Sequence, residues 1–112
     1  MIDQVRPSHL SAWIEHKAAG PGLLLDVREP WELQSASVRA DGFELVAIPM
    51  NAIPARIAEL EPGRPVACLC HHGARSQRVA MFLVQHGFSH VANVAGGIDA
   101  WSQEHDISVP RY

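Results

Sequence analysis

The sequence predicts an α/β domain built on a mostly parallel sheet. Along its 112 residues, short apolar runs alternate with segments of helical spacing, and turn residues separate the two. The apolar runs are nearly continuous, which is typical of strands buried on both faces. The length fits one compact domain, and no repeat, low-complexity tract or linker divides it. We therefore expect a single domain over residues 1–112.

The first expected elements are a short strand at 4–5 and a helix opened by Pro7 and Ser8. The helix is predicted because residues on one face recur at positions i, i+3, i+4 and i+7. These residues are Leu10, Trp13, Ile14 and Lys17. Gly-Pro-Gly at 20–22 is expected to end the helix, because both residue types interrupt helices.

The apolar run Leu-Leu-Leu-Asp-Val at 23–27 predicts a central strand that ends at the edge where ligands bind in such folds. Pro-Trp-Glu-Leu at 30–33 fits one helical turn, and Leu-Val-Ala-Ile-Pro at 45–49 fits a third strand. The connection at 34–44 has no clear pattern, although Asp41 and Gly42 suggest a turn within it.

A second helix is expected after the third strand. Asn51 is the predicted N-cap, and Pro54 is tolerable in the first turn. The apolar residues of this helix are Ile53, Ile57 and Leu60.

The remaining strands and helices follow the same alternation. Val-Ala-Cys-Leu-Cys at 66–70 predicts a buried strand, and the helix expected over 76–86 places Gly87 at its C′ position. Val-Ala-Asn-Val at 91–94 predicts the last strand. Gly-Gly at 96–97 precedes a closing helix whose apolar residues include Ile98 and Trp101.

Composition and charge limit the classes of partner. The hydrophobic fraction of 47% and the charged fraction of 19% are those of an ordinary globular protein. The net charge of −3 gives no reason to expect nucleic acid or an acidic membrane surface as a partner. Any positive charge that matters must therefore be local.

Cysteine content and the N-terminal sequence predict the compartment. Cys68 and Cys70 are too few and too close together for a disulfide framework, which favours a reducing compartment. The N-terminus lacks a charged segment followed by an apolar core, and no run of about 18 apolar residues occurs. We therefore expect a soluble cytoplasmic protein.

The candidate site is Cys-His-His-Gly-Ala-Arg-Ser at 70–76, at a junction of strand and helix where α/β sheets bind ligands. Backbone amides that converge at a helix N-terminus favour an anion, which can be a phosphate, a sulfonate or a thiolate. Cys70 is therefore the candidate nucleophile. Arg75 adds a fixed charge with a planar fork of donors, and Gly73 permits a backbone conformation that a side chain would hinder.

Two other interpretations of this stretch are open at this point. A zinc site is disfavoured because no second Cys-x-x-Cys or spaced histidine pair completes four ligands. A polar loop beside a buried thiol is the ordinary interpretation of a single cysteine.

Three stretches in order resemble the rhodanese family. The loop at 70–76 is similar to its active-site loop, the stretch at 23–33 to its second-strand signature, and the stretch at 88–101 to its last strand, Gly-Gly and closing Ala-Trp helix. The order and spacing agree over roughly residues 5–104. The resemblance implies the rhodanese fold, a five-stranded parallel sheet flanked by helices on both faces, in a single-domain member.

The resemblance also implies a sulfurtransferase. In the family, a cysteine thiolate takes a sulfane sulfur from a donor such as thiosulfate and passes it, through a persulfide, to cyanide or a thiol. Cys70 would be the nucleophile, and Arg75 would face the anionic donor. The residues that would hold the persulfide and the donor are His71, His72, Gly73, Ala74, Arg75 and Ser76. The implied partners are a small-molecule sulfur donor and a thiol or cyanide acceptor, or a protein persulfide, with no metal or organic cofactor.

Two alternative functions remain open. Phosphatases of a related branch have one more residue in the loop than the four that separate Cys70 from Arg75, so the shorter loop favours sulfur over phosphate. A rhodanese-like binding or regulatory module with weak catalysis is the second alternative. The presence of both Cys70 and Arg75 argues against it.

Several further residues have predicted structural roles. Cys68 is expected to share a sheet face with Cys70 and to be a buried structural thiol rather than a sulfur relay. Asp26 and Arg28 match the family's Asp-x-Arg and are expected to fix neighbouring loops by charged hydrogen bonds. Arg78 is expected on a solvated helix face.

The connection at 34–45 departs from the family, in which many members have a Gly-His-Ile-x-Gly-Ala segment. Loops on this side of the sheet shape access to the site, so the departure leaves the identity of donor and acceptor open. Trp31, just before this connection, is a candidate pocket wall, whereas Trp101 is expected to be a packing residue.

Overall fold

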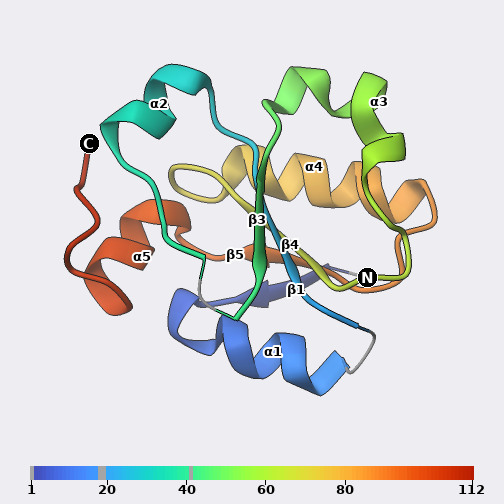
Figure 1. Cartoon of the computed structure of the whole chain (residues 1–112), viewed down its shortest axis with the longest axis horizontal. Helices are drawn as coiled ribbons and strands as arrows, with labels where there is room; N and C mark the ends of the chain where they lie inside the picture. The colour runs from blue at the N-terminus through green and yellow to red at the C-terminus, as the bar shows by residue number, and fades with distance from the viewer. Residues whose placement is uncertain (1, 18–19, 41) are drawn as a thin grey trace.

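The chain forms a five-stranded parallel sheet with the strand order β1-β5-β4-β2-β3, shown in Figure 1. This computed structural model describes residues 2–17, 20–40 and 42–112. The strands are β1 (Ile2–Val5), β2 (Leu23–Asp26), β3 (Glu44–Ala47), β4 (Val66–Leu69) and β5 (Val91–Val94). The order places β4 in the middle of the sheet, so the loop that follows it emerges between the ends of two neighbouring strands.

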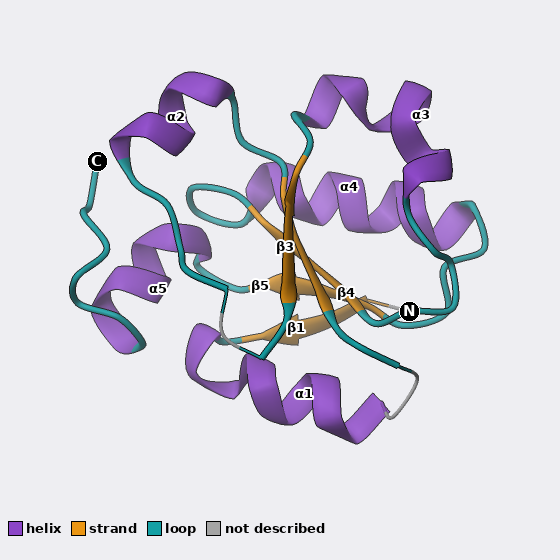
Figure 2. Cartoon of the chain, viewed as in Figure 1, coloured by secondary structure: helices purple, strands orange, loops and turns teal. Residues whose placement is uncertain are grey.

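Helices cover both faces of the sheet, as Figure 2 shows. They are α1 (Leu10–Lys17), α2 (Pro30–Ser35), α3 (Ile53–Arg56), α4 (Ala74–Gln85) and α5 (Gly97–Glu104). Short 3-10 turns at Pro7–His9, Met50–Ala52 and Ile57–Glu59 adjoin α1 and α3. This arrangement confirms the predicted α/β sheet with helices on both faces. No helix of the described residues is long and apolar enough to cross a membrane.

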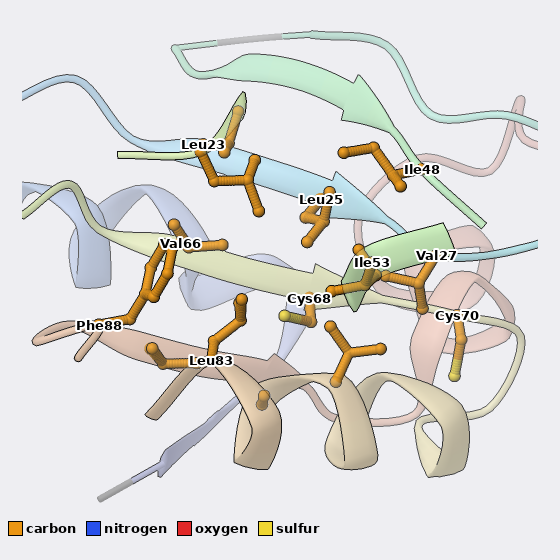
Figure 3. Packing of buried hydrophobic residues seen from close by; sticks show 14 residues of the cluster. Leu23, Leu25, Val27, Ile48, Ile53, Val66, Cys68, Cys70, Leu83 and Phe88 are labelled. Carbon is orange, nitrogen blue, oxygen red and sulfur yellow. The ribbon is translucent and has the colours of Figure 1, made fainter. Parts of the chain in front are cut away.

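Alternate residues of the central strands enter two separate cores. The first core lies under α3 and α4 and contains Leu25 of β2, Cys68 of β4 and Leu83 of α4, which are labelled in Figure 3. The second core lies under α1 and α5, where Trp101 is 2% exposed. Both faces of these strands are covered, which explains their continuous apolar sequences. Trp101 is thereby confirmed as a packing residue.

Strands β1 and β3 depart most from the sequence-based expectation, whereas β2 and β4 each end one residue earlier than expected. β1 begins at Ile2 rather than at residue 4, because all four of its residues pair in register with β5. β3 spans Glu44–Ala47 rather than 45–49, because its register with β2 aligns Glu44 with Leu23. In both cases the neighbouring strand sets the length, which the local sequence does not encode.

Helix bounds were also predicted wrongly in places: α1 begins at Leu10 rather than at Pro7, and α3 ends at Arg56, before Ile57 and Leu60. Asn51 does not cap a helix, because it lies inside the 3-10 turn that begins at Met50, whose amide binds the carbonyl of Val27 at 3.0 Å. Helix α4 begins at Ala74 rather than at residue 76, since Gly73 takes a left-handed conformation with φ 111° and directs the chain into the helix. Gly87 after α4 has φ 90°, which confirms the predicted C′ glycine.

The connection after α2 is irregular and partly buried. Ala36 and Val38 are each 4% exposed and pack in the second core. Phe43 meets Trp101 edge-on, with ring centroids 6.1 Å apart. Gly42 has φ 78°, whereas Asp41 of the predicted turn lies outside the described residues.

A buried ion pair joins β2 to α2. Arg28 is fully buried, and its Nε and Nη2 donate to the two carboxylate oxygens of Asp26 at 2.9 and 2.8 Å. The same guanidinium donates to the carbonyls of Glu32 and Ala36 at 3.2 and 2.8 Å. The prediction that Asp26 and Arg28 fix neighbouring loops by charged hydrogen bonds is therefore confirmed.

Removal of the Arg28 guanidinium should destabilise the fold strongly. Arg28→Ala leaves the buried Asp26 carboxylate without its partner, which costs about 3–5 kcal/mol in comparable cases. Arg28→Lys keeps the positive charge but not the planar fork of donors, so the loss in free energy of unfolding should be smaller than for Arg28→Ala. Urea unfolding followed by fluorescence measures both. The control is Arg56→Ala, which breaks an exposed pair with Glu59 and should change stability little.

Candidate active site

Cys70 lies directly after β4, with its sulfur inside the loop that leads into α4. Its side chain is 1% exposed and belongs to the first core, on the same sheet face as Cys68 (Figure 3). The amide of Gly73 donates to Cys70 Sγ at 3.0 Å. The sequence predicted that backbone amides of the loop point toward an anion, and the Gly73 amide does point toward the Cys70 sulfur.

The hydroxyl of Ser76 is the second polar contact of the sulfur, with Oγ 3.2 Å from Cys70 Sγ. Ser76 is fully buried and also donates to Asn93 Oδ1 at 2.5 Å. The orientation of the Asn93 amide is fixed, because its Nδ2 donates at 3.2 Å to the carbonyl of Gly73, which can only accept. The single Ser76 proton is thus directed to Asn93, and a turn of this hydroxyl would direct it to Cys70 Sγ instead.

The N-terminus of α5 holds the first part of the loop. The amide of Ile98 donates to the carbonyl of Cys70 at 2.9 Å, and the amide of Asp99 donates to the carbonyl of His71 at 3.2 Å. Gly97 permits this approach, because a Cβ at that position would lie 2.4 Å from the His71 carbonyl oxygen and 2.5 Å from that of Cys70. The Gly-Gly turn therefore positions the active-site loop.

Arg75 lies in the first turn of α4 and is paired with a protein carboxylate. Its Nη1 and Nη2 donate to the two oxygens of Glu32 on α2 at 2.6 and 2.7 Å. This bidentate pair holds the pKa of Glu32 at about 2 and raises that of Arg75. The fork that we expected to face an anionic donor is thus engaged by the 3% exposed carboxylate of Glu32.

The two histidines of the loop form an aromatic stack with Tyr112. The His71 ring lies 3.9 Å from that of His72 and 4.0 Å from that of Tyr112, at interplanar angles of 21° and 9°. Burial lowers the pKa of His71, and the neighbouring His72 lowers it further. The neutral form of His71 is therefore favoured, in keeping with a buried Nε2 that has no hydrogen-bond partner among the described residues.

The other residues of interest lie apart from the sulfur. Ala74 is exposed at the start of α4, and Trp31 is 64% exposed with its ring edge-on to that of Tyr112. Cys68 is fully buried, and burial raises the pKa of its thiol, so it remains protonated. Arg78 is exposed at the rim of an apolar groove of about 270 Å³ between α3 and α4. Within the described ranges, no three His, Cys, Asp or Glu side chains gather as a metal site would require.

Sequence reasoning missed three residues that shape the site. Asn93 had a signal, since it is the one polar residue of the apolar run at 91–94. Glu32 had a weak signal, because it follows Glu29 at capping-box spacing, and the Glu29 amide does donate to it at 3.0 Å. Tyr112 had none, because its place beside the loop results from the path of the chain after α5.

Comparisons with known proteins show what this chain is similar to. A family model described as the rhodanese-like domain matches residues 7–104. The chain is 38% identical over 81 residues to a sulfurtransferase from Allochromatium vinosum, with 72% of each protein covered. It is 34% identical over 90 residues to the thiosulfate sulfurtransferase GlpE of Vibrio cholerae, with 80% of this chain and 78% of that protein covered.

Solved structures show the same similarity. The crystal structure of a rhodanese-related protein from Thermoplasma volcanium superimposes with a TM-score of 0.74 and 31% sequence identity. The match covers 92% of this chain and 93% of that one.

Gly97→Ala should displace the loop around Cys70. The added Cβ would overlap two loop carbonyls, so the backbone must move. Because Cys70 is only 1% exposed, we expect faster alkylation of Cys70 by iodoacetamide and a lower melting temperature. Gly87→Ala is the matched control, because φ is also positive there but no atom lies within 4 Å. It should cost only about 1–2 kcal/mol of conformational energy and leave Cys70 unaffected. Equal effects of the two substitutions would show that crowding at Gly97 is unimportant.

Glu32→Gln should lower stability at neutral pH but not in strong acid. The carboxylate has a folded pKa of about 2 against its ordinary value of 4.5, so its contribution is complete above pH 4.5 and is lost as the pH falls through about 2. Because Arg75 is one-third exposed and partly screened, we expect about 2 kcal/mol at pH 7. Urea unfolding of both proteins from pH 7 to pH 2 measures the difference. A difference that does not shrink in acid would contradict the pairing.

Proposed function

Because the chain belongs to the rhodanese-like domain family, we propose that it is a sulfurtransferase that moves sulfane sulfur through a persulfide at Cys70. The observation that carries this proposal is the Cys70 sulfur, held at the carboxyl end of β4 with the Gly73 amide 3.0 Å away. The names of the sulfurtransferase relatives support the reaction class. The proposal includes residues 1–112 acting as one rhodanese domain in the cytoplasm.

The first half-reaction forms the persulfide. The Cys70 thiolate attacks the outer sulfur of a donor such as thiosulfate, a new S–S bond forms, and the donor's S–S bond breaks. Sulfite leaves with the electron pair of that bond, so the charge is balanced. In the second half-reaction, cyanide or a thiolate attacks the outer sulfur of the persulfide and regenerates the Cys70 thiolate.

The loop supplies the positioning for both steps. The Gly73 amide, which donates to Sγ in the resting state, would donate to the charged sulfur, and a turn of the Ser76 hydroxyl would add a second donor. The pair with Glu32 uses one proton of each terminal nitrogen of Arg75, which leaves the remaining guanidinium protons for the oxygens of an anionic donor. His71, His72 and Ala74 complete the rim of the loop.

The loop length favours sulfur transfer over phosphate hydrolysis. Four residues separate Cys70 from Arg75, one fewer than in the related phosphatases, and a tetrahedral phosphate needs a wider ring of amides than a single sulfur atom. Thiosulfate, a low-molecular-weight persulfide and a protein persulfide all present a sulfane sulfur to this loop. No metal or organic cofactor is part of the proposed reaction.

Cys70→Ala should abolish transfer, whereas Cys68→Ala should retain most of it, because Cys68 is a buried thiol outside the loop. The measurements are the thiosulfate:cyanide rate and the intact mass after incubation with thiosulfate. The mass of the wild-type protein and of Cys68→Ala should rise by one sulfur atom. Rapid release of phosphate from an aryl phosphate with no such mass change would overturn the proposal, and so would loss of transfer through Cys68→Ala alone.

A further inference from the structure

Tyr112, which the sequence did not single out, makes polar and stacking contacts around the Cys70 loop. Its hydroxyl donates to Glu32 Oε2 at 2.6 Å and accepts from Arg28 Nη1 at 3.1 Å. Its ring stacks on His71, the residue next to Cys70, at 4.0 Å and 9°. One side chain therefore contacts three groups that have separate roles in the fold and in the site.

These contacts reach both ends of the loop. At the start of the loop, the Tyr112 ring covers the His71 ring. At its end, Arg75 binds the same Glu32 carboxylate that accepts from the Tyr112 hydroxyl. Through Arg28, Tyr112 is also joined to the buried pair at the end of β2.

The segment that brings Tyr112 to the loop is anchored along its length. Ser102 on α5 donates to the carbonyl of Val109 at 2.6 Å, and Val109 is 4% exposed in the second core. Arg111 donates to Asp99 on the first turn of α5 at 2.9 Å. Figure 1 shows this segment running from the end of α5 along the outside of the molecule toward α2. These contacts hold the segment before Tyr112 in position, so that Tyr112 lies against the loop.

We propose that Tyr112 is a positioning residue that keeps the Cys70 loop closed around its sulfur. The ring supports the start of the loop, and the hydroxyl fixes the Glu32 carboxylate that orients Arg75 at its end. Because Cys70 is only 1% exposed, a small opening of the loop changes access to the sulfur considerably. This role deepens the proposed sulfur transfer. Only the kinetic test of Tyr112 rests on that proposed function, because the alkylation test needs no sulfur transfer.

Two substitutions separate the two contacts. Tyr112→Phe keeps the stacking on His71 and removes both hydrogen bonds, so kcat/KM for thiosulfate should fall about tenfold, the size expected when a hydrogen bond to a charged group is lost. The fall should lie mainly in KM, since Arg75 would be less well oriented toward the anion. Tyr112→Ala also removes the ring, and alkylation of Cys70 by iodoacetamide should become severalfold faster as the loop opens. The alkylation is measured in a Cys68→Ala background.

Ser102→Ala is the matched control, because it removes a buried hydrogen bond of the same segment at Val109, whereas the bond of Arg111 to Asp99 and the contacts of Tyr112 itself still hold Tyr112 against the loop. It should lower the melting temperature while leaving kcat/KM and the alkylation rate within about twofold of wild type. All rates are measured well below every melting temperature. If the Tyr112 variants behave like Ser102→Ala, or like wild type, the inference is wrong.

The alkylation measurement tests the role of Tyr112 independently of sulfur transfer. If wild-type protein forms no persulfide, sulfur transfer is refuted, but the alkylation rates of Tyr112→Ala and Ser102→Ala still decide the role of Tyr112. Tyr112 is also the only tyrosine of the chain, so its ring resonances are unambiguous in an NMR spectrum. Alkylation of Cys70 should shift them, and unchanged resonances would contradict close coupling between the ring and the loop.

Discussion

The saturated guanidinium of Arg28 is the interaction on which the site depends. It is fully buried, and it makes two hydrogen bonds to Asp26, two to carbonyls of Glu32 and Ala36, and one to Tyr112. A buried charge is tolerated only when it is paired and hydrogen-bonded throughout, so these partners must keep their positions. The geometry of α2, and with it the Glu32 carboxylate, follows from that requirement.

The Glu32 side chain, whose position depends on α2, contacts the residues that hold the loop. Its side chain accepts from the Glu29 amide, from both terminal nitrogens of Arg75 and from the Tyr112 hydroxyl. On the opposite side, the first turn of α5 and the Asn93 amide bind loop carbonyls. The loop around Cys70 is therefore held by α2, β5 and α5 together, and a nucleophile in a preorganised loop needs little rearrangement before reaction.

Local patterns were good guides to the elements and poor guides to their ends. The apolar runs at 23–27, 66–70 and 91–94 predicted buried strands correctly, because burial on both faces leaves a direct mark on composition. The cap at Asn51 was wrong because a hydrogen bond between Met50 and Val27, far apart in sequence, sets the turn there. Gly73 and Gly97 were recognisable as glycines in turns, but only the structure shows which carbonyls Gly97 must approach.

The sequence by itself determined the fold class, the order of the elements and the place of Cys70 at the end of a central strand, because periodicity and motif order are properties of neighbouring residues. The tertiary structure alone decided that Arg75 is paired with Glu32, that Ser76 gives its proton to Asn93, and that Tyr112 lies against His71. These pairs are separated by 17 to 43 residues along the chain. Contacts of this kind depend on how the helices and the final segment pack around the sheet, which no local pattern records.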